Sequence, residues 1–166
     1  IDQALVLFGF PQSLFADIRK TRDYSLVNDW FDITLFYSEC RVRLKAGFFV
    51  REPLPAYILH GKIGSFLKSR GDVQEDELKL GKKPMVLDWG KEPEYKSGVL
   101  HTTIEGAEVR ENIPTLLGNY YGFFDALYQS IANGAKEPVS ASEGIAVMKI
   151  IDAAMKSSET KQIITF

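Results

Sequence analysis

The first half of the chain alternates apolar and polar residues with a period of two, which is typical of strands with one covered face. Three such runs come before residue 52. Their apolar positions are Leu14, Ala16 and Ile18; Phe31, Ile33, Leu35 and Tyr37; and Val42, Leu44, Ala46, Phe48 and Val50. The link between Tyr37 and Arg41 is short enough for a hairpin, so the second and third strands are predicted to be antiparallel neighbours.

Shorter runs predict more strands in the rest of the chain. They cover residues 56–60 and 65–68, on either side of a turn at 61–64, then 99–104 and 107–110, and finally 161–166. The strands 99–104 and 107–110 are joined at Glu105-Gly106. Residues 82–97, which include Trp89, read as an irregular surface loop.

Apolar residues spaced by three and four predict two helices near the end of the chain. One runs from Thr115 to Ala132 and ends at Asn133-Gly134, and the other begins at the capping box 140–143 and continues through Met155. A second capping box at 72–75 predicts a short helix over 76–80. The acidic residues there suit the positive end of a helix dipole better than a metal site.

These elements predict an α+β fold in one domain, residues 1–166, with a largely antiparallel open sheet and helices packed on one face. The segment 1–11 reads as the back half of a helix that ends at Gly9 and Pro11. It carries one carboxylate, Asp2, in an otherwise apolar run. We therefore expect part of the protein, and part of a functional site, to lie upstream of Ile1.

Composition narrows the classes of function. The 166 residues include 20 basic and 22 acidic ones, mixed along the chain, with a net charge of −2. This balance argues against nucleic-acid and membrane-surface binding, and no apolar run reaches the roughly 20 residues that span a bilayer. Cys40 stands alone, which excludes intrachain disulfides and cysteine metal clusters, and we expect an inert thiol. A cytoplasmic location is the default expectation.

Familiar motifs of catalysis and cofactor binding are absent from the sequence. There is no G-x-G-x-x-G, no phosphate-binding G-x-x-x-x-G-K-[S/T] and no H-E-x-x-H. His60 and His101 are far apart on predicted strands, where half-buried sheet residues are the favoured interpretation. The loop 61–64 looks like the clamp of an RNA-binding module, but it joins strands rather than helices, so that interpretation is discounted.

Three basic residues, Arg41, Arg43 and Lys45, fall on one face of a predicted strand. Two interpretations have equal weight: a solvated face whose charges pair with Asp17 or Asp32, or a face that meets another subunit. Binding of an anion is a weaker third interpretation.

Laid out in this order, the chain resembles the C-terminal domain of the Gfo/Idh/MocA family of oxidoreductases almost from end to end. The motifs that carry the resemblance are Ile1–Leu5 with Leu7–Pro11; His60–Phe66 with Asp72, Gln74–Glu75 and Leu78; Asp88–Gly90; and Glu137–Ala141 with Ile150–Ala154 and Ser157–Ser158. The order and spacing of these motifs make the match specific.

The resemblance implies an N-terminal Rossmann domain that binds NAD or NADP, and a C-terminal domain that shapes the substrate pocket and forms a homo-oligomer through its open sheet face. It implies hydride transfer on a sugar, polyol or related carbonyl compound, with the catalytic lysine in the nucleotide domain. Asp2 matches the family's aspartate near the substrate carbinol, where a carboxylate orients a hydroxyl or assists proton transfer. Some members carry a catalytic histidine where this chain has Val6, and the subgroup's own histidine would fall just before Ile1.

We therefore expect the substrate-binding and oligomerisation domain of an NAD(P)-dependent oxidoreductase. By itself it should neither bind the cofactor nor turn over the substrate, whose pocket it shares with the missing domain. The alternative is a non-enzymatic scaffold or interaction module with the same fold, which would not need a carboxylate at Asp2.

Overall fold

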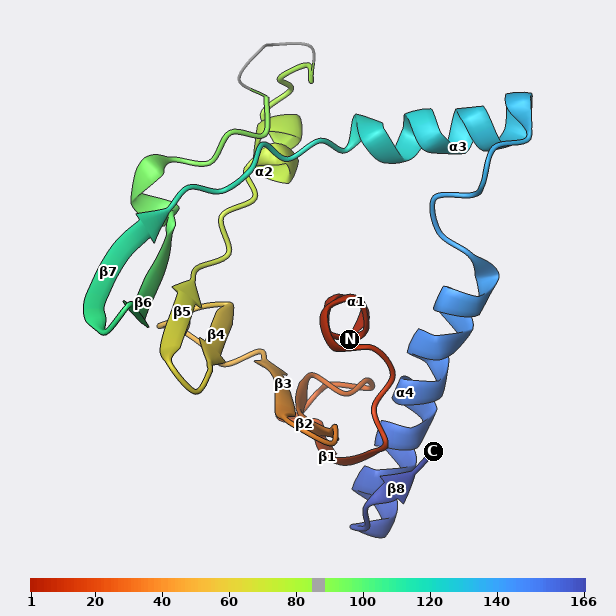
Figure 1. Cartoon of the computed structure of the whole chain (residues 1–166). Coiled ribbons are helices and arrows are strands. Elements are labelled where there is room, and N and C mark those ends of the chain that lie inside the picture. Colours follow the sequence, from red (N-terminus) through yellow and green to blue (C-terminus); the bar gives the residue numbers. More distant parts are fainter. Residues whose placement is uncertain (85–88) are drawn as a thin grey trace. The chain divides into compact units, whose positions relative to one another are not determined.

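The computed structural model describes residues 1–84 and 89–166, which divide into two compact units (Figure 1). Unit 1 comprises Ile1–Arg51 and Val139–Phe166, and unit 2 comprises Glu52–Pro138. Unit 1 is therefore assembled from both ends of the chain. The single domain expected for residues 1–166 stays a prediction.

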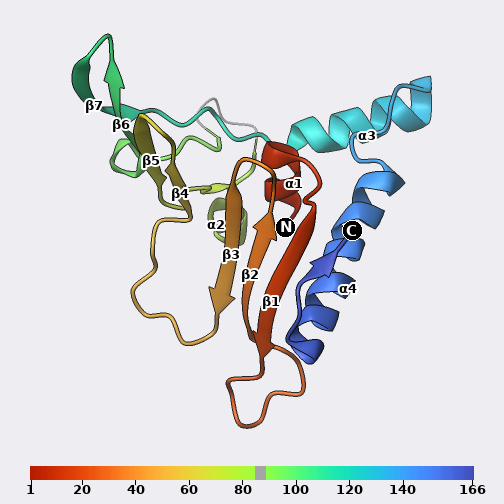
Figure 2. The ribbon, with the colours of Figure 1, turned by 60° about the horizontal axis from the view of Figure 1, so that its bottom comes forward.

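Unit 1 contains one antiparallel sheet with the strand order β3-β2-β1-β8 (Figure 2). Its elements are α1 (Asp2–Phe8), β1 (Ser13–Arg19), β2 (Trp30–Phe36), β3 (Arg41–Gly47), α4 (Ala141–Thr160) and β8 (Ile164–Thr165). The predicted hairpin between the second and third strands is confirmed, and the backbone N–H of Tyr37 donates to the carbonyl of Cys40 where it turns. The third strand ends at Gly47 and does not reach Val50. The capping box at Ser140 and Glu143 is confirmed.

Unit 2 contains a second antiparallel sheet with the order β4-β5-β6-β7. Its elements are β4 (Tyr57–His60), β5 (Gly64–Lys68), α2 (Gln74–Lys79), the 3-10 helix η1 (Glu94–Lys96), β6 (Gly98–Ile104), β7 (Ala107–Ile113) and α3 (Tyr121–Asn133). Glu105 and Gly106 both have positive φ, as the two-residue hairpin that joins β6 to β7 requires. The α+β fold class is confirmed, with the strands distributed over two four-stranded sheets.

Helix α3 begins at Tyr121 and not, as predicted, at Thr115. The reason is that the preceding segment bonds to another loop and to helix α2 instead of forming helical hydrogen bonds. The backbone N–H of Gly118 donates to the carbonyl of Gly90, and that of Tyr120 donates to the side chain of Gln74. These bonds hold the backbone away from the helix until Tyr121.

The core of unit 1 lies between the sheet and its two helices. It contains alternate residues of β1 and β2 together with residues of α1 and α4: Ala4, Leu14, Ala16, Ile33, Leu35, Ile150, Ala153 and Ala154. The strand residues in this set are those that the period-two pattern assigned to the covered face. Each fully buried leucine or isoleucine of this cluster contributes about 1.5–3 kcal/mol, and the small alanines allow α4 to approach the sheet closely.

Two serines of α4 complete the hydrogen bonding of strand β1. Strand β8 pairs with β1 only at Ser13 and Leu14, which leaves the next backbone groups on that edge without a strand partner. The Ser157 hydroxyl accepts from the N–H of Ala16 at 2.9 Å and donates to the carbonyl of Gln162 at 2.6 Å. The Ser158 hydroxyl accepts from the N–H of Ile18 at 2.9 Å. Helix α4 thus replaces a missing strand along this edge.

Replacing Ser157 by Ala should destabilise the protein by about 1–3 kcal/mol, because it leaves the buried N–H of Ala16 without an acceptor. The free energy of unfolding, measured by urea denaturation, tests this. Ser142→Ala, at an exposed serine in the first turn of the same helix, should change it by less than about 0.5 kcal/mol. Equal effects of the two substitutions would contradict the bridging role of Ser157.

The loop between β1 and β2 is organised by the carboxylate of Asp29, whose side chain is 5% exposed. Asp29 accepts hydrogen bonds from the backbone N–H of Thr21 at 2.6 Å, the hydroxyl of Thr21 at 2.8 Å and Nε of Arg22 at 2.8 Å. The bond from the Arg22 side chain is the main cause that holds the pKa of Asp29 well below its ordinary value. Arg22 in turn lies 4.2 Å from the ring centroid of Phe48.

A lowered pKa in the folded state means that ionised Asp29 contributes stability above the unfolded pKa, about 3.9, and that this contribution is lost as the pH falls through the folded pKa. Asp29→Asn should therefore lower the thermal midpoint at pH 7. The difference in thermal midpoint between the variant and the unchanged protein should shrink as the pH falls from about 5 to 2. Circular dichroism melts across that range test this. Asp23→Asn, at an exposed residue of the same loop, is the control. A difference that stays constant with pH would contradict the assignment.

Candidate functional site

Helix α1 positions the predicted site residue Asp2. The helix packs on the core through Ala4, with Ile1 and Leu5 partly buried beside it. Asp2 lies in the first turn and is exposed. A carboxylate is favoured there by the positive end of the helix dipole. The helix ends at Gly9, with φ of 74°, whose carbonyl accepts from the hydroxyl of Tyr37 at 2.9 Å.

The turn of α1 that follows Asp2 exposes apolar side chains. Val6 lies one turn further along α1, so its side chain is next to Asp2 on the helix surface, and it is 78% exposed. Leu7 is exposed as well. A histidine at position 6 would lie within reach of Asp2, whereas valine has no proton to transfer. This chain therefore supplies one ionisable group and an uncovered apolar surface around it, and such surfaces mark places of interaction.

The two histidines belong to unit 2, on β4 and β6, whereas Asp2 belongs to unit 1. Both are exposed, so the expectation of half-buried residues is wrong. They lie on one face of the sheet, where Ser65 is the cross-strand partner of both. Nδ1 of His60 is 2.8 Å from Oγ of Ser65, and Nε2 of His101 is 2.6 Å from Oε1 of Glu108. Ile58 on the same face is also exposed, which shows that unit 2 leaves this face uncovered.

The predicted capping box at 72–75 is wrong. Helix α2 starts at Gln74, and its N-cap residue, Val73, makes no side-chain hydrogen bond. Instead, Asp72 accepts from the backbone N–H of Gln74 at 3.0 Å, from its side-chain amide at 3.1 Å, and from the Tyr120 hydroxyl at 3.1 Å. Partial burial opposes the ionised form, but these hydrogen bonds outweigh it and lower the pKa of Asp72. The same contact with Asp72 raises the pKa of Tyr120.

Gln74 holds three loops of unit 2 together. It is 2% exposed, and its side-chain carbonyl accepts from the N–H of Tyr120 at 2.8 Å. A Cβ at Gly118 would lie 2.6 Å from the Gln74 amide nitrogen, and one at Gly90 would lie 2.2 Å from the carbonyl of Gly118. Both positions therefore exclude side chains. Gln74 and Gly90 belong to the motifs singled out in the sequence, and the structure gives them a structural role. Asp88, from the same motif, lies outside the described residues.

The outer face of the β1-β2-β3 sheet, opposite α1 and α4, carries the basic residues of β3. Nε of Arg43 donates a hydrogen bond to the Asp32 carboxylate at 2.8 Å, and this confirms the expected pairing. The same hydrogen bond is the main cause of the lowered pKa of Asp32. Arg41 and Lys45 instead lie 4.9 Å and 5.6 Å from the ring centroids of Phe36 and Trp30. Asp17 pairs with Arg19 and with Lys161.

Trp30 lies across the backbone of Gly47 on this outer face. A Cβ at Gly47 would be only 2.5 Å from Cδ1 of Trp30, so the glycine makes room for the indole. The guanidinium of Arg19 is 5.4 Å from the ring centroid. The result is a face of paired charges and aromatic rings that no other element of unit 1 covers.

The described residues do not fit a dinucleotide. Both sheets are antiparallel throughout, so this part of the chain builds no parallel βαβ unit with a glycine loop at a helix start. Within residues 1–84 and 89–166 no group of three or more histidine, cysteine, aspartate or glutamate side chains could hold a metal ion. None of the helices described there has the length and apolar character to cross a membrane.

Comparison with known proteins agrees with this geometry. The model of the oxidoreductase family's C-terminal alpha/beta domain matches residues 1–166. The scyllo-inositol 2-dehydrogenase (NADP(+)) IolW of Bacillus subtilis is 40% identical over 166 residues, 99% of this chain and 46% of that protein. The uncharacterized oxidoreductase YdgJ of Escherichia coli is 35% identical over 160 residues, 96% of this chain and 45% of that protein. The solved structure of YvaA from Bacillus subtilis has a TM-score of 0.95 at 38% identity and covers 99% of this chain and 48% of that one.

A family model that matches the whole chain, with a fold shared at this level, defines an oxidoreductase C-terminal domain. The chain belongs to the Gfo/Idh/MocA oxidoreductase family. It spans about half the length of the curated relatives it matches.

Proposed function

We propose that this chain is the substrate-side domain of an NAD(P)-dependent oxidoreductase that acts on a sugar, a polyol or a related carbonyl compound. The observation that carries the proposal is the position of Asp2, exposed at the start of α1 near the exposed apolar side chains of Val6 and Leu7. The similarity to IolW, an inositol dehydrogenase by name, supports a polyhydroxylated substrate. A cytoplasmic location stays a prediction.

In this proposal the carboxylate of Asp2 accepts a hydrogen bond from a substrate hydroxyl and so orients the carbon that is oxidised. The apolar side chain of Val6 keeps water away from that bond, which strengthens it. Hydride acceptance is the chemistry that a nicotinamide supplies when bound. The residues that bind the nicotinamide belong to the half of the complete protein that this chain does not contain, whereas Asp2 also assists transfer of the hydroxyl proton.

Replacing Asp2 by Asn in the complete protein should lower kcat by roughly 10²–10⁴-fold, since the amide can neither carry the charge nor take up a proton. Steady-state assays of dinucleotide reduction on a panel of inositols and sugars measure this. Asp152→Asn, at an exposed carboxylate of α4, is the matched control and should leave turnover unchanged. Unchanged turnover in a folded Asp2→Asn protein would sink the assignment and favour a scaffold or a site built elsewhere.

We also propose that the protein forms a homo-oligomer through the outer face of the β1-β2-β3 sheet. Its exposed Phe15, the indole of Trp30 and the arginines of β3 are the residue types that dominate protein interfaces. Arg19 and Arg43 on this face are already paired with Asp17 and Asp32, so these charges can be covered at a smaller desolvation cost than single charges.

Phe15→Asp should weaken this association by roughly 30-fold or more, because it places a carboxylate in the centre of the proposed interface on the outer face of the sheet. Sedimentation velocity at tens of micromolar measures the change. Leu26→Asp, at an exposed apolar residue of the β1-β2 loop, should leave the assembly intact. A monomeric unchanged protein at that concentration would count against the proposal, and so would an assembly that survives Phe15→Asp.

A further inference from the structure

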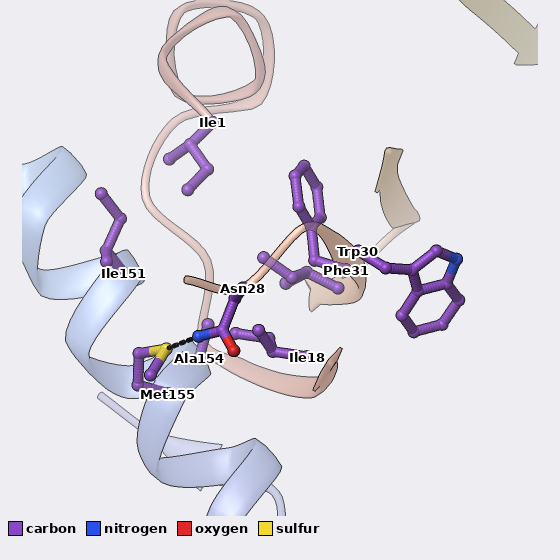
Figure 3. Close-up of a pocket in the computed structure, with 9 residues that line it drawn as sticks. Ile1, Ile18, Asn28, Trp30, Phe31, Ile151, Ala154 and Met155 are labelled. Atoms are coloured by element: carbon purple, nitrogen blue, oxygen red, sulfur yellow. Dashed lines mark hydrogen bonds between the residues drawn. The ribbon is translucent and has the colours of Figure 1, made fainter. Parts of the chain in front are cut away.

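Unit 1 has an apolar groove between α4 and the inner side of the sheet, with Ile1, Phe31 and Ile151 on its walls (Figure 3). Asn28, Ile151 and Met155 of the lining are exposed, so the groove is open to solvent. Its apolar walls fit many occupants equally well, and it therefore defines no particular partner. The outer edge of the sheet in unit 2 is more specific, because it combines backbone groups and charges in a fixed order.

Strand β7 forms that edge, next to β6 and with no strand of the described residues on its other side (Figure 1). It is seven residues long, whereas β4 at the opposite edge has four. Its pairing with β6 is continuous, without a bulge, and its sequence AEVRENI contains neither lysine nor proline. Shortness, bulges, lysine and proline commonly keep an edge from pairing, and β7 lacks all four. This edge is therefore available to a further strand.

The hairpin at Glu105-Gly106 decides which backbone groups of β7 point outwards. A two-residue hairpin closes on a hydrogen-bonded pair, here Ile104 and Ala107, and such pairs then recur at every second residue. The residues between them direct their N–H and C=O groups away from β6: Glu108, Arg110 and Asn112. These backbone groups have no hydrogen-bond partner among the described residues.

Two opposite charges stand side by side on the same edge. Glu108 and Arg110 are two residues apart, so their side chains lie on one face of β7, and both are exposed. Oε1 of Glu108 is 2.6 Å from Nε2 of His101. Arg110 forms neither an ion pair nor a hydrogen bond with the residues that the structure describes. The edge thus presents an exposed guanidinium that lacks a carboxylate of its own.

We propose that β7 pairs with β7 of a second copy of this chain, antiparallel and centred on Val109. A two-fold axis at Val109 sets Glu108 of each copy opposite Arg110 of the other, so two ion pairs form across the axis. In this register the same two residues exchange their outward backbone hydrogen bonds. An axis at Glu108, Arg110 or Glu111 would instead bring two like charges together, which is destabilising. Charge therefore selects the register centred on Val109.

This pairing is separate from the contact proposed for the outer face of the sheet in unit 1, and it does not depend on Asp2. Two short strands in water associate only marginally, and exposed ion pairs add little. The pairing of β7 therefore adds to a larger contact and does not replace it. A disulfide that traps the paired state detects so weak an association directly.

The first test places single cysteines on β7 of the complete protein, with its native cysteines, Cys40 included, replaced by serine. Val109 occupies a non-hydrogen-bonded position on the axis, where the two Cα atoms lie about 4.5 Å apart, within the range of a disulfide. Val109→Cys should therefore oxidise to a linked pair of chains. Electrophoresis without reduction and mass spectrometry measure the rate.

Ala107→Cys and Glu111→Cys are the matched controls, on the same face of β7 as Val109. In the proposed register each control residue is displaced from its own copy by four positions, roughly 14 Å. Both should link at least about tenfold more slowly than Val109→Cys, since a disulfide needs Cα atoms within about 7 Å. Equal rates, a faster control, or no link at Val109→Cys would overturn the proposal.

The second test exchanges the charges in the Val109→Cys protein. Glu108→Arg or Arg110→Glu alone sets like charges opposite each other and should slow the linking roughly fivefold or more. The two substitutions together restore opposite charges and should restore the rate. Each rate is divided by that of the same thiol with iodoacetamide, which removes the effect of neighbouring charges on thiol reactivity.

Rescue by the double substitution distinguishes contact between copies from a change within one chain. Circular dichroism establishes that each variant is folded. Single variants that link as fast as the parent, or a double variant that stays slow, would overturn the proposal. Because the readout is a disulfide on β7, either result leaves the proposals on Asp2 and on Phe15 to their own tests.

Discussion

The contact between α4 and the edge of β1 is the constraint on which unit 1 depends. Ser157 and Ser158 supply hydroxyl oxygens to the N–H groups of Ala16 and Ile18, and neighbouring alanines and isoleucine of the same helix complete the core. The two serines accept the backbone hydrogen bonds that a neighbouring strand would otherwise accept, because β8 is too short to pair with all of β1. The helix is therefore held in one register along the sheet, and α1, which packs on the same core through Ala4, is positioned with it.

The candidate site follows from that placement. Asp2 has no partner among the other chemistry-bearing residues of unit 1, so its position depends on how firmly α1 is attached to the core. Ala4 fixes one side of the helix, and the bond from the Tyr37 hydroxyl to Gly9 fixes its end. The site residue is thus presented from a rigid element, while the apolar surface around it stays uncovered in this chain. If this domain shares its substrate with another domain, as proposed, a carboxylate held on an open surface is what it requires.

Periodicity predicted most of the fold, because a strand with one covered face has apolar, buried residues at every second position. The buried residues Leu14, Ala16, Ile33 and Leu35 follow this pattern. Periodicity failed where a polar side chain forms hydrogen bonds with residues far away in the sequence. Gln74 is buried among loops and takes bonds that a local capping box would have used, and no spacing rule reports a partner as distant as Tyr120. The role proposed for Asp2 comes from resemblance to a family and not from pattern, since an exposed aspartate in a helical turn carries no signal of its own.

Unit 1 is built from residues 1–51 and 139–166, with all of unit 2 between them. During synthesis the inner face of β1 and β2 therefore leaves the ribosome long before the helix that covers it. Until Ser157 emerges, the edge of β1 has no native partner and its apolar side chains lack the cover of α4, so both are open to contact with other chains. Unit 2, by contrast, is synthesised without interruption. The first fifty residues of this domain therefore wait for their covering helix while roughly the next hundred are translated.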